Sequence, residues 1–248
     1  MVPPWLSTLA STGMAVGAPL VYADQTVSII RKKDSAGFAR DICAVLLVAN
    51  ITRCFFWLGE RFEFALLMQS LLMILGQLVL LYFCVIYRPR LSPDNLGASS
   101  RPLSFWQWTT YSQHIEFLAG YIVFLTILVL IFGRLETFVW LLGFFALGLE
   151  STLPLPQFIR LVTLLNYKQK SLYGFRVSTL IGWVVGDAFK TVYFFVQGSP
   201  LQFKICAIFQ LSVDIAIIGQ RLVYGNAPPL ASLAEEDDLE QALALAEE

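Results

Sequence analysis

Long apolar stretches alternate with short polar turns over most of this sequence. Read as helices that rise 1.5 Å per residue, the stretches match the roughly 30 Å of hydrocarbon in a bilayer. We expect seven membrane-spanning helices, at residues 5–30, 38–58, 62–87, 113–132, 137–166, 172–197 and 201–224. The first could instead be a cleaved signal peptide, but no basic residue precedes it, so we expect a span.

Two parts of the chain repeat the same pattern of rare residues. In each, a proline inside an apolar stretch, Pro19 or Pro156, is followed at the same spacing by a Gly-Phe pair. The same offset aligns polar residues that are scarce in such stretches: Asn50 with Asp187, and Arg53 with Lys190. Each repeat covers three spans, and the fourth span is left unpaired between them. The fold predicted is therefore an all-α integral membrane protein of two three-helix repeats joined by a linker helix.

This repeat sets the predicted domain organisation. Residues 1–87 form the first repeat, 88–136 a cytoplasmic linker with the fourth helix, 137–225 the second repeat and 226–248 a tail. The linker is rich in Pro, Ser, Asn and Gly, as loops are. The tail is acidic, and we expect it to be solvated and disordered.

Loop charge predicts the orientation in the membrane. Most basic residues fall in the loops after spans one, three and five and in the tail, whereas the opposite side holds Arg61, Arg134 and Lys204. Because basic loops face the cytoplasm, we expect a lumenal N-terminus and a cytosolic C-terminus. Because each repeat has three spans, the single additional linker helix gives both repeats the same orientation in the membrane.

Composition narrows the class of protein. The chain is 57% hydrophobic and 14% charged, with a mean hydropathy of +0.67, whereas a soluble domain carries roughly a quarter charged residues. With a net charge of -1, no nucleic-acid surface is expected. The sequence has no nucleotide-binding loop, catalytic triad or metal-ligand spacing, so we expect no enzyme, cofactor or metal. The four cysteines lie inside spans, where they are expected to be small packing residues.

Two groups of residues within the spans point to function. Prolines break helices, and in a membrane neighbouring helices satisfy the freed backbone groups, so Pro19, Pro156 and Gln157 are predicted hinges. Charged side chains in a bilayer are costly and normally face a wet cavity. The predicted substrate pathway consists of Asp24, Asn50, Arg53, Glu150, Arg160, Asp187, Lys190 and Asp214.

Position along each span gives these pathway residues a depth. Glu150, Asp187, Asp214 and Asn50 are placed near the midplane, Asp24 and Arg160 nearer the cytoplasm, and Arg53 and Lys190 nearer the lumen. This depth estimate puts three midplane acids together with no base beside them. The alternative is that the charges are structural pairs between or along helices, such as Asp187 with Lys190.

Aromatic and histidine residues flank the fourth span. Trp106, Trp108 and Tyr111, and Trp5 at the start of the first span, are expected as interfacial anchors. His114 is expected to be a polar residue at the start of the helix; a proton relay with Glu116 is the alternative.

The pattern of Pro156-Gln157 followed by Gly174-Phe175 resembles the PQ-loop repeat proteins, a group related to SWEET transporters, lysosomal amino-acid exporters and the KDEL receptor. The resemblance covers almost the whole chain up to Tyr224, and Pro19-Leu20 departs from the motif. It is strongest to the eukaryotic branch that contains a fungal endosomal and Golgi antagonist of aminophospholipid flippases. SWEET transporters have the same parallel arrangement of repeats.

The resemblance implies a phospholipid scramblase of an endosomal or Golgi membrane that needs no energy source. The leading alternative is a proton-coupled transporter of a small solute such as an amino acid. A sorting receptor would need a basic lumenal pocket, and that side is poor in Lys and Arg. A scaffold is the fourth hypothesis, since the acidic tail offers a site for a cytoplasmic protein partner. Membrane phospholipids are the expected partners.

Overall fold

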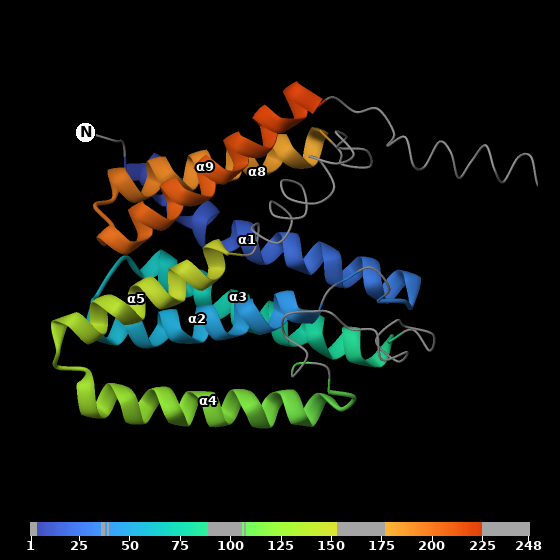
Figure 1. Cartoon of the computed structure of the whole chain (residues 1–248), viewed down its shortest axis with the longest axis horizontal. Helices are drawn as coiled ribbons and strands as arrows, with labels where there is room; N and C mark the ends of the chain where they lie inside the picture. The colour runs from blue at the N-terminus through green and yellow to red at the C-terminus, as the bar shows by residue number, and fades with distance from the viewer. Residues whose placement is uncertain are drawn as a thin grey trace, which may run out of the picture. The chain divides into compact units, whose positions relative to one another are not determined.

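The computed structural model describes residues 4–35, 38, 40–88, 106, 108–152 and 177–224. These residues form seven α-helices (Figure 1): α1 (Pro4–Lys32), α2 (Arg40–Gly59), α3 (Phe64–Ile86), α4 (Tyr111–Phe132), α5 (Glu136–Ser151), α8 (Val177–Val196) and α9 (Leu201–Tyr224). Within the described part of the chain there is no β-strand. The prediction of an all-helical fold is confirmed.

Five of these helices are long and apolar enough to cross a membrane, namely α1, α2, α3, α4 and α9. Large apolar side chains cover their outer surfaces, as on a protein surrounded by lipid; Leu130 of α4, for example, is 81% exposed. The prediction of a membrane protein is therefore confirmed. The described part of α5 ends at Ser151, so the second half of the predicted fifth span lies outside the described residues.

Contacts divide the chain into two units. Unit 1 comprises Met1–Glu150 with Val196–Phe203, and unit 2 comprises Ser151–Phe195 with Lys204–Glu248. Unit 1 therefore contains α1 to α5, together with the turn after α8 and the first residues of α9. The predicted repeat boundaries rest on the sequence and remain predictions.

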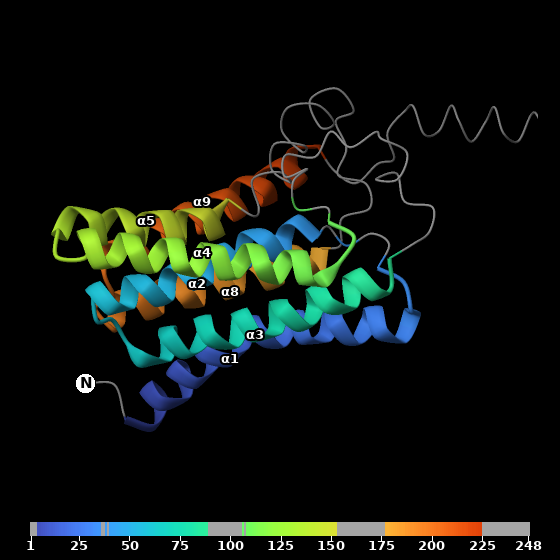
Figure 2. The same cartoon turned by 90° about the horizontal axis from the view of Figure 1, so that it is seen from below.

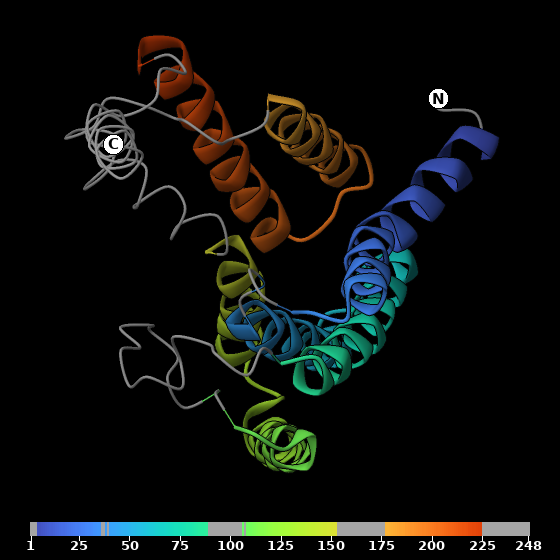
Figure 3. The ribbon, with the colours of Figure 1, turned by 90° about the vertical axis from the view of Figure 1, so that its right-hand side faces the viewer.

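Within unit 1, α3 lies between α1 and α2. Both helices pack along α3, and neither makes its main contacts with the other. The view along the helix axes shows the same order (Figure 3). The buried face of α3 includes Leu66, Met73 and Leu80, spaced about two turns apart, so one stripe of the helix faces its neighbours.

The connection from α1 to α2 is tied to the far end of α3. Ser35 donates its backbone N–H to the carbonyl oxygen of Tyr87 at 3.1 Å, and its hydroxyl lies 3.3 Å from the carbonyl oxygen of Cys84. The last carbonyls of a helix lack partners within the helix, so these bonds complete the C-terminus of α3.

Helix α1 changes direction along its length (Figure 2). Pro19 lies inside it and cannot donate a backbone hydrogen bond, which is the usual cause of such a bend. The role of Pro19 as a hinge remains a prediction. Pro156 and Gln157, its predicted counterparts, lie outside the described residues.

Helices α4 and α5 pack against α2. The hydroxyls of Thr52 on α2 and Tyr121 on α4 are hydrogen-bonded at 2.6 Å. Gly143 on α5 faces the ring of Phe56 so closely that a Cβ atom there would lie 2.7 Å from a ring carbon. The absence of a side chain at Gly143 thus sets how near α5 approaches α2.

Candidate functional site

An ion pair lies inside unit 1 among apolar side chains. The guanidinium of Arg53 on α2 pairs with the carboxylate of Glu150 on α5, and their side chains are only 3% and 17% exposed. The Arg53 guanidinium also lies 5.8 Å from the centre of the Phe203 ring, within range of a cation–π contact. Buried charges of this kind are stable only when paired, because desolvation of a lone charge is costly.

Aromatic rings close one side of this ion pair. Phe203 packs against Phe62 with ring centres 4.9 Å apart and against Phe56 at 6.3 Å. The three rings fill the space at the end of α2 where the chain turns into α3. They keep the surroundings of Arg53 apolar, which strengthens its attraction to Glu150.

Two buried amides lie on the helices of unit 1. Asn50, one turn before Arg53, is 1% exposed; its Nδ2 donates to the carbonyl oxygen of Leu46 at 2.8 Å, and its Oδ1 has no hydrogen-bond partner among the described residues. On α3, neither polar atom of the fully buried Gln77 side chain has such a partner within the same part of the chain. Unsatisfied buried polar groups are unusual, and they mark places where a water or a polar ligand group can bind.

Unit 2 contains a second polar cluster, between α8 and α9. The Nζ of Lys190 donates to Oε1 of Gln210 at 2.7 Å and lies 3.9 Å from Oδ1 of Asp187. The carboxyl group of Asp187 lies near that of Asp214, which is 2% exposed.

Six of the eight predicted pathway residues lie in these polar regions, three in each unit, and their role in a pathway remains a prediction. Asn50, Arg53 and Glu150 lie in unit 1, and Asp187, Lys190 and Asp214 in unit 2. Asp24 is exposed on α1 and has no ion-pair partner among the described residues. Arg160 lies outside the described residues.

The expectation that the midplane acids have no base beside them was wrong. Glu150 pairs with Arg53, and Asp187 lies within 3.9 Å of Lys190, as the structural alternative predicts. A depth counted from the span ends places only the backbone of each residue. Long Arg and Glu side chains can reach a partner at a different depth on a neighbouring helix.

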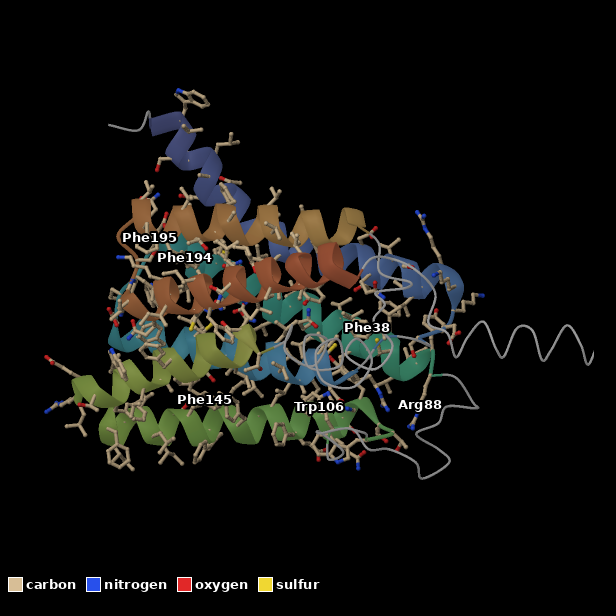
Figure 4. The ribbon with its side chains drawn as sticks, turned by 45° about the horizontal axis from the view of Figure 1, so that its top comes forward. Phe38, Arg88, Trp106, Phe145, Phe194 and Phe195 are labelled. Carbon is tan, nitrogen blue, oxygen red and sulfur yellow. The ribbon has the colours of Figure 1, made fainter. Side chains whose placement is uncertain are left out.

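His114 is fully buried within unit 1. Its Nδ1 lies 3.0 Å from the carbonyl oxygen of Thr110 and its Nε2 3.2 Å from that of Trp106. Trp106, at the end of the unit where α4 begins (Figure 4), is fully buried and packs edge-on against the His114 ring at 4.9 Å. It is therefore no exposed interfacial anchor, because its ring packs against His114 and Phe117 of α4.

Two polar residues of the clusters were not among the predicted site residues. Gln210 accepts the hydrogen bond of Lys190, and Gln77 is a fully buried amide. Both are amides inside apolar spans, where polar residues are scarce, and this scarcity is a signal that could have identified them. The four cysteines are free thiols, and three of them are buried.

Comparisons with known proteins agree with this picture of a polar membrane bundle. Residues 138–203 match the model of the PQ loop repeat. Scramblase ANY1 from Saccharomyces cerevisiae is 27% identical over an alignment of 301 positions, which covers 90% of this chain and 72% of the relative. The match to the PQ loop repeat begins in α5 and ends at the start of α9, and it includes Pro156-Gln157. The chain thus carries a PQ loop repeat, and its predicted resemblance to the PQ-loop repeat proteins is confirmed.

Proposed function

We propose that this protein is a scramblase that moves phospholipids between the two leaflets of an endosomal or Golgi membrane without an energy source. The observation that carries the proposal is the similarity to Scramblase ANY1, which extends over 90% of the chain. PQ-loop proteins also include transporters. The chemistry of the polar clusters is therefore needed to decide between a scramblase and a transporter.

The chemistry of the clusters suits a phospholipid headgroup. A zwitterionic headgroup carries a phosphate and an amine, and each unit offers a base for the first and an acid for the second: Arg53 with Glu150, and Lys190 with Asp187. Charge-assisted hydrogen bonds to both groups offset the loss of water as a headgroup enters the bilayer. In this mechanism the ion pairs open to receive the headgroup and close behind it.

The remaining features of the proposal concern the whole chain. Its spans form two parallel three-helix repeats joined by α4, with the N-terminus in the lumen and the acidic tail in the cytosol, where the tail offers a site for a protein partner. Pro19 and Pro156 act as hinges. The repeat correspondence of Arg53 with Lys190, and of Asn50 with Asp187, supports this arrangement.

The second candidate is a proton-coupled transporter of a small solute. The neighbouring carboxyl groups of Asp187 and Asp214 favour it, because acidic residues inside membrane spans are typical of proton relays. The scramblase ranks first because the similarity to Scramblase ANY1 extends over 90% of the chain.

Reconstitution of the purified protein into sealed vesicles with a fluorescent phospholipid tests the proposal. A membrane-impermeant reductant bleaches only the outer-leaflet probe in protein-free vesicles. We expect bleaching to pass well beyond this level with the protein, in the absence of ATP and of a pH gradient. Bleaching at the protein-free level, together with solute uptake driven by a pH gradient, would replace the scramblase with the transporter.

A further inference from the structure

A cavity of about 400 Å³ opens where three helix ends of unit 1 meet. Its walls come from the end of α2, the turn between α4 and α5, and the first turns of α5. They include the charged side chains of Glu60, Arg134 and Glu136 and the ring of Trp140. The volume lies in the range of small-molecule sites, about 300–1,000 Å³.

An apolar cavity of about 290 Å³ continues from the charged one. The two share Gly59, Gly133 and Arg134, so they are continuous. Leu58 and Leu130 line the apolar part and are 53% and 81% exposed, so this part opens on the outer surface of the helices, where lipid lies. The two cavities therefore form one groove, with charged residues along one part and apolar residues along the other.

The order of these walls follows the order of layers in a membrane. Helix α4 has 22 residues and is about 33 Å long, so it crosses the hydrocarbon and ends near an interface. Glu60, Arg134 and Glu136 lie at or just beyond the helix ends, at headgroup depth. Leu130 on α4 and Leu142 on α5 lie further along their helices, at the depth of acyl chains.

The charges of the cavity do not neutralise one another. In the part of the chain that the structure describes, no ion pair joins Arg134 to Glu60 or Glu136. A ligand with one anionic and one cationic group would satisfy all three side chains. The guanidinium suits a phosphate, which it can bind with two hydrogen bonds, and the two carboxylates suit an amine.

We infer that this groove is a binding site for a phospholipid with a zwitterionic headgroup. Arg134 holds the phosphate, Glu60 and Glu136 hold the ammonium group, and one acyl chain lies against Leu58 and Leu130. An anionic headgroup without an amine meets two carboxylates and only one base, so it binds less well. The inference goes beyond the proposed function, because a lipid can occupy this groove whether or not the protein moves lipids.

The fluorescence of Trp140 can report lipid binding at this site. Bromine atoms on an acyl chain quench a nearby tryptophan, and the difference between the protein and its Trp140→Phe variant isolates the Trp140 signal. The full chain in detergent micelles is titrated with brominated phospholipids that share acyl chains but carry a phosphocholine, phosphoethanolamine or phosphoglycerol headgroup. We expect the two zwitterionic lipids to quench Trp140 at about tenfold lower mole fraction than the anionic one, a difference of about 1.4 kcal/mol.

Charge variants assign the headgroup contacts. Arg134→Gln should remove the quenching at low mole fraction, and Arg134→Lys should keep part of it, since one charge remains but the two-pronged geometry is lost. Glu60→Gln with Glu136→Gln should abolish or reverse the order of the headgroups. Arg61→Gln is the matched control, because Arg61 lies over the Trp57 ring at 3.8 Å and does not line the groove.

The outcomes separate the site from the proposed function. Equal quenching by all three lipids, unchanged by Arg134→Gln and Arg134→Lys, would show an ordinary surrounding lipid and overturn the site. If the lipid order is lost while scrambling in vesicles stays intact, the site is wrong and the function stands. If Trp140 shows the expected order and no scrambling occurs, the site stands and the proposed function fails.

Discussion

Arg53 on α2 and Glu150 on α5 form an ion pair that is almost closed to solvent. The pair links the two helices of unit 1 that also meet at Phe56 and Gly143. One of these contacts is charged and the other is a close apolar fit, so the two can be tested independently.

Removal of one partner of the ion pair should destabilise the protein strongly. Arg53→Gln leaves the Glu150 carboxylate without its charged partner in an apolar site, and we expect a loss of about 3 kcal/mol in the free energy of unfolding. Unfolding by denaturant in detergent measures this. Glu116→Gln, on the exposed surface of α4, is the control and should change little. A loss no larger than that of the control would show that the pair contributes nothing.

Two glycines of α5 should respond oppositely to the same substitution. Gly143→Ala places a methyl group against the Phe56 ring, and such overpacking costs about 1–3 kcal/mol. Gly148→Ala meets no atom within 4 Å and gains helix propensity, so it should be neutral or stabilising by up to about 1 kcal/mol. Thermal unfolding of both variants in the same detergent compares them. Equal effects would contradict the close approach of α5 to α2.

His114→Phe should lower stability without a loss of specific activity. The substitution removes ring nitrogens that lie against the carbonyl oxygens of Thr110 and Trp106, at a cost of about 1–3 kcal/mol. Lipid scrambling per folded molecule should be unchanged, because both nitrogens already face backbone acceptors. A folded but inactive variant would instead support the proton relay.

The carboxyl pair of unit 2 should matter for transport more than for folding. For Asp187→Ala and Asp214→Ala we expect scrambling to slow by about tenfold, equivalent to about 1.4 kcal/mol of barrier. Asp187→Asn and Asp214→Asn keep the shape and remove the negative charge, so they separate the effect of charge from that of shape. If all four variants scramble at the normal rate, the pair is structural.

The turn between α8 and α9 tests the topology. Gly198 has a positive φ of 65°, which glycine adopts without strain, so an accessible tag should be inserted beside it and not in its place. We expect this tag and one at the C-terminus to be labelled from opposite sides of sealed vesicles. Labelling from the same side would refute the predicted orientation.

Much of the helical layout could be predicted from the sequence, because apolar length alone sets where a chain crosses a membrane. Helix α4 begins at Tyr111 and ends at Phe132, next to the predicted bounds of 113 and 132. The buried charges could also be predicted as a set, since Arg53 and Asp214 are rare residues in such stretches.

The pairing of those charges could not be predicted. Whether Glu150 meets Arg53 depends on which helices are neighbours and on the reach of their side chains, and periodicity along one helix contains neither. Trp106 shows the same limit, because its burial depends on its packing against His114 and Phe117 and not on its own position at a span end. The groove at Arg134 likewise arises from three helix ends that are distant in sequence.

The position of α3 has a consequence for biosynthesis. Since α1 and α2 both pack on α3, a ribosome that has released only the first two helices has delivered two segments without their main partner. Ser35, in the connection between them, also lacks its hydrogen-bond partners until the end of α3 has been made, because these partners are the carbonyl oxygens of Cys84 and Tyr87. Unit 1 can therefore begin to close only when Tyr87 has been translated, and until then the insertion machinery must keep α1 and α2 from pairing with other helices.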